Sequence, residues 1–243
     1  MNKPFVSIVI LVRNSPYFER SIESILCTSS IEDVEVLIKV DSDEDILPYA
    51  NILKKSGLPH KILVYDRGEG SNDLHLFWLD LFRLAKGDFI FMCSDDMIIY
   101  DNGWVEKLRE VLNRFEDEIV VCTFSKVVKR KFKNGVRRNG TKKGTMCPVI
   151  NRKFFECNKE YISPGRGVDK YIRLIATTVK RYIHIRGIKF SVNQIKVKDK
   201  DKDPNVCRGY GFGGEAKCTK LWKFEPEKHI EKIRQKIRES SIN

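Results

Sequence analysis

With 243 residues, of which 42% are hydrophobic, the chain has the size and composition of one α/β domain with a small appendage. It shows no apolar run long enough to cross a bilayer, no secretory signal and no C-x-x-C pair among its seven cysteines, which disfavours a membrane-spanning, secreted or zinc-binding protein and predicts a cytoplasmic one. The net charge of +12 is uneven: residues 1–125 hold 13 Lys and Arg against 22 Asp and Glu (−9), and residues 126–243 hold 32 against 11 (+21).

The first 125 residues alternate between apolar strands and amphipathic helices. Strands are predicted at residues 5–12, 34–40, 62–65, 89–92 and 119–124, with helices between them. Ser15 is the expected N-cap of the first helix, and Asn72 can cap the helix that Gly87 closes. This alternation predicts an α/β fold with a mostly parallel central sheet and right-handed crossovers.

The pattern is looser after residue 125. Residues 126–143 contain nine Lys or Arg and no acid, which predicts a hairpin or loop. A helix at 168–180 and strand pieces at 182–186 and 188–192 follow, and the chain ends in a basic amphipathic helix at about 226–239. That last helix either docks on its own domain through its isoleucines or lies on an anionic membrane as a peripheral contact.

Polar residues follow three of the apolar strands in the first half. They are Arg13-Asn14, Asp41-Ser42-Asp43 and Asp95-Asp96. Each group could have a structural role, as a helix cap or a turn. Because ligands of open parallel sheets bind at the carboxyl ends of the strands, the three groups together predict one polar pocket. An adjacent carboxylate pair in such a pocket suits Mg²⁺ or Mn²⁺, which take oxygen ligands and bridge to phosphate.

The order of these motifs resembles that of the GT-A glycosyltransferases, and of family 2 in particular. The matching segments are Leu11-Val12-Arg13-Asn14, Val40-Asp41-Ser42-Asp43-Glu44-Asp45, Gly70 with Asn72, Ala85-Lys86-Gly87-Asp88 and Ser94-Asp95-Asp96. The resemblance covers residues 5–115 and, more loosely, 145–195. Two positions depart from it: Cys93 stands where the family often has Asp, and Ser42 replaces the second Asp of an Asp-Asp-Gly-Ser turn.

The resemblance implies a Rossmann-like GT-A domain that uses a nucleotide-sugar donor, with uridine as the base by family analogy. Residues 1–125 would bind the donor, residues 126–225 the acceptor, and residues 226–243 would form the terminal helix. The implied donor-binding residues are Val12, Arg13, Asn14, Asp41 or Asp43 for the base, Asn72, and Asp95 for the ribose or sugar. Asp96, with Asp95, would bind Mn²⁺ or Mg²⁺ across the diphosphate.

The resemblance also implies an inverting reaction on an acceptor hydroxyl, which needs a general base from the second half. Asp169 is the candidate, with Glu160 and Glu156 as alternatives. The acceptor would be a glycan, a lipid-linked molecule or a protein.

Other functions stay open at this point. The basic half could bind nucleic acid or a membrane without catalysis, although residues 126–143 contain only one aromatic residue, Phe132, and no RNA-binding signature. A sugar nucleotidyltransferase is disfavoured because the turn after the first strand, RNSP, has one Arg and no glycine.

Overall fold

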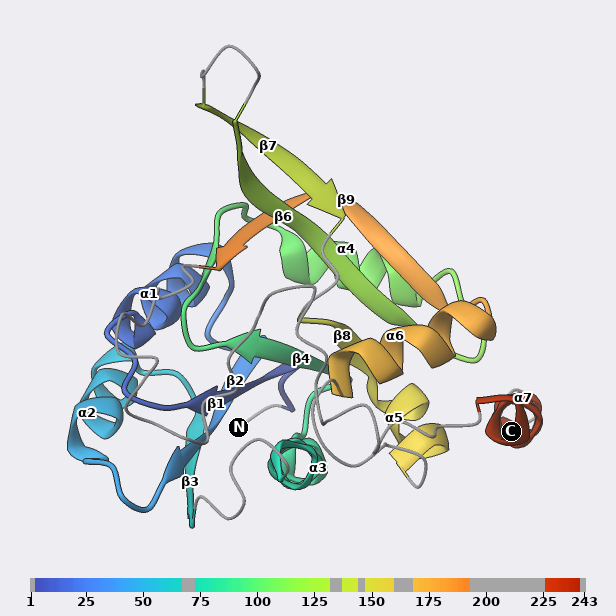
Figure 1. The fold of residues 1–243 in the computed structure, drawn as a ribbon, viewed down its shortest axis with the longest axis horizontal. Coiled ribbons are helices and arrows are strands. Elements are labelled where there is room, and N and C mark those ends of the chain that lie inside the picture. Colours follow the sequence, from blue (N-terminus) through green and yellow to red (C-terminus); the bar gives the residue numbers. More distant parts are fainter. Residues whose placement is uncertain are drawn as a thin grey trace.

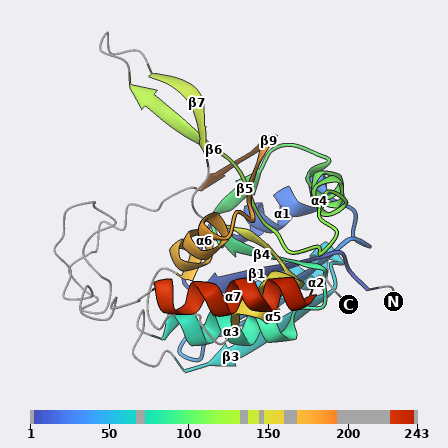
Figure 2. The ribbon, with the colours of Figure 1, turned by 90° about the vertical axis from the view of Figure 1, so that its right-hand side faces the viewer.

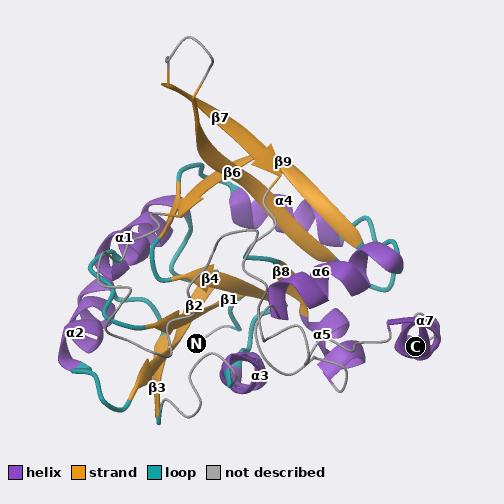
Figure 3. Ribbon diagram, in the orientation of Figure 1, coloured by secondary structure: helices purple, strands orange, loops and turns teal. Residues whose placement is uncertain are grey.

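The computed structural model describes residues 3–66, 73–131, 137–143, 147–159, 168–192 and 226–240. Within these ranges nine strands form one sheet in the order β3-β2-β1-β4-β8-β6-β9-β5, and β7 pairs with β6 to one side of this path. Helices cover both faces of the sheet, and the β6–β7 hairpin projects beyond the body (Figure 1, Figure 3). This confirms the predicted α/β fold.

The first half supplies the parallel core of the sheet. Its strands are β1 (Val6–Val12), β2 (Val34–Asp41), β3 (His60–Tyr65) and β4 (Phe89–Ser94), and neighbouring strands in the order β3-β2-β1-β4 are all parallel. The connecting helices are α1 (Phe18–Thr28), α2 (Leu47–Ser56) and α3 (Leu74–Leu84). The β-branched, apolar strands β1 and β2 are buried along nearly their whole length, as expected for strands covered on both faces.

The second half continues the same sheet with mixed pairing. It comprises β5 (Met97–Ile99), α4 (Trp104–Leu112), β6 (Val121–Lys131), β7 (Arg137–Lys143), β8 (Val149–Asn151), α5 (Arg152–Asn158), α6 (Val168–Thr178) and β9 (Tyr182–Val192). β8 lies antiparallel between β4 and β6, and β9 runs parallel to β6 and antiparallel to β5. The two expected strand pieces around residue 187 are one strand, which passes through Gly187 at a φ of 92°.

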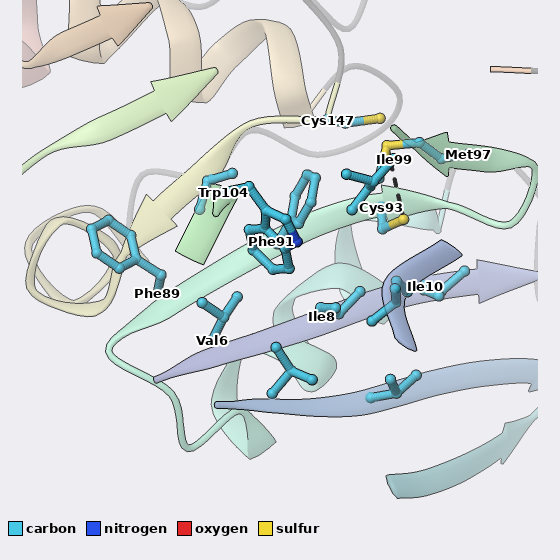
Figure 4. Close-up of a cluster of buried hydrophobic side chains, with 14 of the residues drawn as sticks. Val6, Ile8, Ile10, Phe89, Phe91, Cys93, Met97, Ile99, Trp104 and Cys147 are labelled. Carbon is cyan, nitrogen blue, oxygen red and sulfur yellow. Dashed lines mark hydrogen bonds between the residues drawn. The ribbon is translucent and has the colours of Figure 1, made fainter. Parts of the chain in front are cut away.

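Two hydrophobic cores hold the layers together, one on each face of the sheet. Helices α1, α2 and α4 pack on one face with the side chains of Ile8 and Ile10 (Figure 4). Helices α3, α5 and α6 pack on the other face with Val9. This alternation along β1 follows from the two-residue period of a strand.

The terminal helix α7 (Pro226–Ser240) docks on its own domain. Its buried isoleucines are Ile230, Ile233 and Ile237, and the helix packs against α5 and α6 (Figure 2). Because this apolar face is already buried, the docked alternative is confirmed and the face is not available for a membrane surface. In the described parts of the chain, no helix is both long enough and apolar enough to span a bilayer.

The Ala85-Lys86-Gly87-Asp88 segment lies at the amino ends of the strands. The backbone amide of Gly87 donates to Ser7 Oγ at 2.7 Å, and that of Lys86 donates to Glu35 Oε1 at 2.7 Å. A Cβ at Gly87 would stand 2.5 Å from the backbone nitrogen of Ser7. Glycine is therefore required by close backbone packing, and this motif supports the sheet at the edge opposite to the polar strand ends.

Candidate functional site

The polar strand ends meet at the carboxyl edge of the parallel core. The sheet register pairs Val12 with Val40 and Leu11 with Ser94, so β1, β2 and β4 end at nearly the same level. The residues that follow these three strands are Arg13-Asn14, Asp43-Glu44 and Asp95-Asp96, and Asp41 is the last residue of β2. The structure thus brings together the groups that the sequence predicted to converge.

Arg13 forms the centre of an ion-pair cluster. Its guanidinium binds Asp41, lies 3.4 Å from Asp43 Oδ2 and lies 3.9 Å from Glu44 Oε1. Burial alone would lower the pKa of Arg13, but the three carboxylates raise it above its ordinary value. Arg13 is therefore committed to these acids rather than free to bind a triphosphate, which argues against a sugar nucleotidyltransferase.

Asp41 is held on both sides by cations. Burial would raise its pKa, but Lys39 and Arg13 each bind one carboxylate oxygen and hold the pKa of Asp41 below its usual value. Lys39 is itself buried in β2, with Nζ 3.8 Å from the centroid of the Phe77 ring. Lys39 was not among the predicted site residues, although a lysine inside an apolar strand requires a buried partner and could have been noticed for that reason.

The turn after β1 is shaped by two hydrogen bonds to one carboxylate. Asn14 has a φ of 44°, in the left-handed region that Asn tolerates better than most residues, and its backbone amide donates to Glu44 Oε2 at 3.0 Å. Tyr49 also donates its hydroxyl to Glu44 Oε2 at 3.0 Å. Glu44 and Tyr49, to which no role was assigned from the sequence, thus fix the entry from β1 to α1.

Ser15 does not cap the first helix as predicted. α1 begins at Phe18 with Tyr17 in the N-cap position and without a side-chain cap. Ser15 Oγ instead donates to the backbone oxygen of Asp95 at 3.4 Å, and it also hydrogen-bonds the Asp95 carboxylate. The two strand ends are therefore linked directly, and this contact competes with capping for the same hydroxyl.

Asp95 and Asp96 form a carboxylate pair with little solvent. Burial raises the pKa of Asp95 to about 6, the charge of Asp96 adds to this, and hydrogen bonds from Ser15 and the Arg13 amide oppose it. Asp96 is buried and accepts a hydrogen bond from Ser94. A divalent cation would offset the charge of this pair, so the donor set fits Mg²⁺ or Mn²⁺.

Such a cation would need ligands from outside the protein as well. In the part of the chain that the structure describes, no group of three or more His, Cys, Asp and Glu side chains could hold a metal ion. Mg²⁺ in phosphate-transferring sites commonly keeps waters and phosphate oxygens as ligands and takes only one or two carboxylates. The Asp95–Asp96 pair is consistent with that kind of site.

Asp169 is the predicted site residue that comes from the second half of the chain. It lies in the first turn of α6, and burial raises its pKa. Burial raises the pKa of Cys147 to about 12, and the charges of Asp169 and Asp96 contribute, so both carboxylates act on this one thiol.

Glu156, by contrast, is exposed on α5 and forms an ion pair with Lys159 at 2.5 Å. Gly70, Asn72 and Glu160 lie outside the described residues.

Comparison with models of protein families identifies the family to which a chain with these strand ends belongs. The model named Glycosyl transferase family 2 matches residues 7–170, which is more than half of the chain. The chain belongs to this family. No curated protein was found to match it.

Solved structures show the same fold at low sequence identity. The family 2 chain is similar to S. aureus TarS 1–349, with a TM-score of 0.56 and 14% identity over 77% of this chain and 60% of that one. For TarS 1–349 in complex with UDP, the TM-score is 0.57 and the identity 15%, over 77% of this chain and 60% of that one. For its complex with UDP-GlcNAc, the TM-score is 0.57 and the identity 14%, over 78% of this chain and 59% of that one. The chain thus spans about 60% of the length of these structures, and the likeness shows the GT-A fold.

In this family 2 chain, the cysteine at position 93, where the family often has an aspartate, has a physical explanation. Cys93 is buried among the apolar residues of the first core, and its thiol lies 4.0 Å from the sulfur of Met97 (Figure 4). Burial raises the pKa of Cys93 well above its ordinary value. An aspartate at this position would be desolvated, so the carboxylates available here are those of Asp95 and Asp96.

Proposed function

We propose that this chain is a metal-dependent, inverting glycosyltransferase that moves a sugar from a UDP-sugar to a hydroxyl group of an acceptor. The observation that carries the proposal is the convergence of Arg13, Asp43, Asp95 and Asp96 on one edge of a family 2 sheet. The structures of TarS in complex with UDP and UDP-GlcNAc, which share this fold, support uridine as the base.

Asp43 is the better candidate for binding the base. Both oxygens of Asp41 are engaged by Lys39 and Arg13, whereas the side chain of Asp43 is 58% exposed and lies 3.4 Å from Arg13. The uracil N3–H is a hydrogen-bond donor, and an ionised carboxylate only accepts. The backbone of Val12–Asn14 would line the same pocket, and Asp41 would position Arg13.

The donor diphosphate would lie over Asp95 and Asp96. Asp96 would bind Mn²⁺ or Mg²⁺, with Asp95 beside it and in contact with the ribose or sugar. A bound divalent cation supplies electrostatic stabilisation of the charge that develops on the departing diphosphate. Ser15 and the Arg13 amide, which bind the Asp95 carboxylate, would hold it in place.

Asp169 would act as the general base. The acceptor oxygen forms a bond to the anomeric carbon from the face opposite UDP, the bond between that carbon and the UDP oxygen breaks, and the hydroxyl proton moves to Asp169. A raised pKa suits this task, because it makes the carboxylate a stronger proton acceptor. The electrostatic proximity of Asp169 to the Asp96 region supports this role.

The test is release of nucleoside diphosphate from UDP-GlcNAc, UDP-glucose and GDP-mannose with Mn²⁺, with mixed glycans as acceptors. Release from a UDP-sugar is expected, and Asp169→Asn should slow it by about 10²- to 10⁴-fold, the usual contribution of a general base. Glu156→Gln, a matched loss of one carboxylate outside the site, should leave the rate unchanged. Equal rates for native protein and folded Asp169→Asn would remove Asp169 from the mechanism.

A further inference from the structure

The β6–β7 hairpin is a basic arm with unusual pairing. Residues 126–131 and 137–143 contain Lys and Arg but no Asp or Glu. The register places Lys126 opposite Lys142, Arg130 opposite Arg138, and Lys131 opposite Arg137. Clustered Lys and Arg without a compensating acid attract anions, so the hairpin has the composition of an anion-binding segment.

The hairpin begins beside the candidate site. Lys126 pairs in the sheet with Phe190 of β9, and Phe190 pairs with Ile99 of β5, the short strand that directly follows Asp96. The charge of Lys126 also acts on Cys147, the thiol on which Asp96 and Asp169 act. From this base the arm runs outward, away from the body (Figure 1, Figure 2). The five residue steps from Lys126 to Lys131 span about 17 Å.

We propose that the β6–β7 hairpin binds the acceptor, and that the acceptor is a glycan bearing repeated phosphate or carboxylate groups. The proposal rests on the proposed transferase function and adds its substrate class. An anionic chain lying along the arm would have its free hydroxyl at the base, on the side where β5 directly follows Asp96. The positive second half would thus attract the acceptor, while the negative first half binds the donor with its cation.

The described hairpin fits an anionic glycan better than nucleic acid or a membrane. Its strands contain a single aromatic residue, Phe124, which is fully buried in the core, so they offer no platform for stacking bases. Beyond Phe124 their only apolar residues are Val127 and Val128, and a surface that inserts into a membrane needs more apolar area than that.

The proposal is tested on the full chain by fluorescence anisotropy with labelled glycans. The probes are phosphomannan and hyaluronan, with neutral dextran, a single-stranded DNA and vesicles containing phosphatidylserine for comparison. The hairpin variant combines Lys129→Gln, Arg130→Gln, Arg137→Gln and Arg138→Gln. A matched control removes four charges from the other half, with Arg20→Gln, Lys54→Gln, Lys55→Gln and Lys61→Gln. UDP affinity with Mn²⁺ is measured for each protein.

The native chain is expected to bind an anionic glycan, and the hairpin variant to bind it roughly 30-fold more weakly, if each charge contributes about half a kcal/mol. UDP affinity should be unchanged in both variants. Equal losses in the two variants, a loss of UDP affinity in the hairpin variant, or hairpin-dependent binding that favours DNA or vesicles would overturn the proposal. Hairpin-dependent glycan binding by a protein that binds no UDP would overturn the transferase function instead, so the two failures are distinguishable.

Discussion

At the scale of single residues, three aspartates show how the surroundings decide the state of a carboxylate. Asp41 is buried but contacts two cations, and its pKa is lowered. Asp95 is half-buried beside another carboxylate, with hydroxyl and amide donors as its hydrogen-bond partners, and its pKa rises to about 6. Asp169 is half-buried in the first turn of a helix, and its pKa is raised as well. Asp41 is therefore suited to a structural role, whereas Asp95 and Asp169 are suited to receiving a cation or a proton.

Replacing Asp41 should therefore affect stability more than replacing Asp43. Asp41→Asn leaves Lys39 without its buried ion-pair partner, which is expected to lower the free energy of unfolding by about 3 kcal/mol. Asp43→Asn removes an exposed contact and should cost about 0–1 kcal/mol, but it should weaken UDP binding. Urea denaturation and UDP titration of both variants check this. Equal stability of the two would contradict the structural role of Asp41.

The pH dependence of turnover should report the raised pKa of Asp169. A general base works only when deprotonated, so kcat/KM should be constant above its pKa and fall as the pH drops through it. Because burial raises the pKa of Asp169, this fall should occur above the value of about 3.9 for a free aspartate. UDP binding measured over the same pH range separates this effect from Asp95. An acid limb at or below the free value would be inconsistent with a desolvated base.

At the scale of elements, local patterns predicted the first half well and the second half less well. The apolar runs that became β1, β2 and β4, and the polar residues after them, could be read directly from the sequence. β5 and β8 could not, because three residues such as Met97–Ile99 carry no periodicity and form strands only through distant partners. The bond from Ser15 to Asp95 was missed for the same reason, because it joins the ends of two different strands. The Lys39–Asp41 pair, by contrast, lies within β2 and could have been noticed from the sequence.

The packing at Gly87 gives a sharp test at this scale. Gly87→Ala would place a Cβ 2.5 Å from Ser7 N and 2.7 Å from the Val6 carbonyl carbon, both backbone atoms that cannot yield. A loss of about 3 kcal/mol in unfolding free energy is expected for such overpacking. Gly57→Ala is the control, because a Cβ there meets nothing within 4 Å. With its φ of 71°, this variant should lose only about 1 kcal/mol. If Gly87→Ala costs no more than Gly57→Ala, the close approach is not what fixes the turn.

At the scale of the whole molecule, one continuous sheet joins two halves of opposite charge. Strand β6 runs from Val121 to Lys131 and so crosses the point near residue 125 at which the composition changes. The sequence predicted the charge contrast but not its geometry, because the order of strands in the second half depends on long-range pairing. The fold uses this pairing to join the basic hairpin, through β6 and β9, to β5, the strand that directly follows Asp96.

The central claim is that Asp95 and Asp96 form a metal-dependent site for a nucleoside diphosphate. Calorimetric titration of the full chain with UDP and GDP, each with and without Mn²⁺, tests it most directly. We expect UDP to bind with micromolar affinity only when Mn²⁺ is present, and Asp96→Asn to abolish this binding while the control Asp80→Asn, on α3, retains it. UDP binding that is indifferent to Mn²⁺ and to Asp96, or no nucleotide binding at all, would contradict the account.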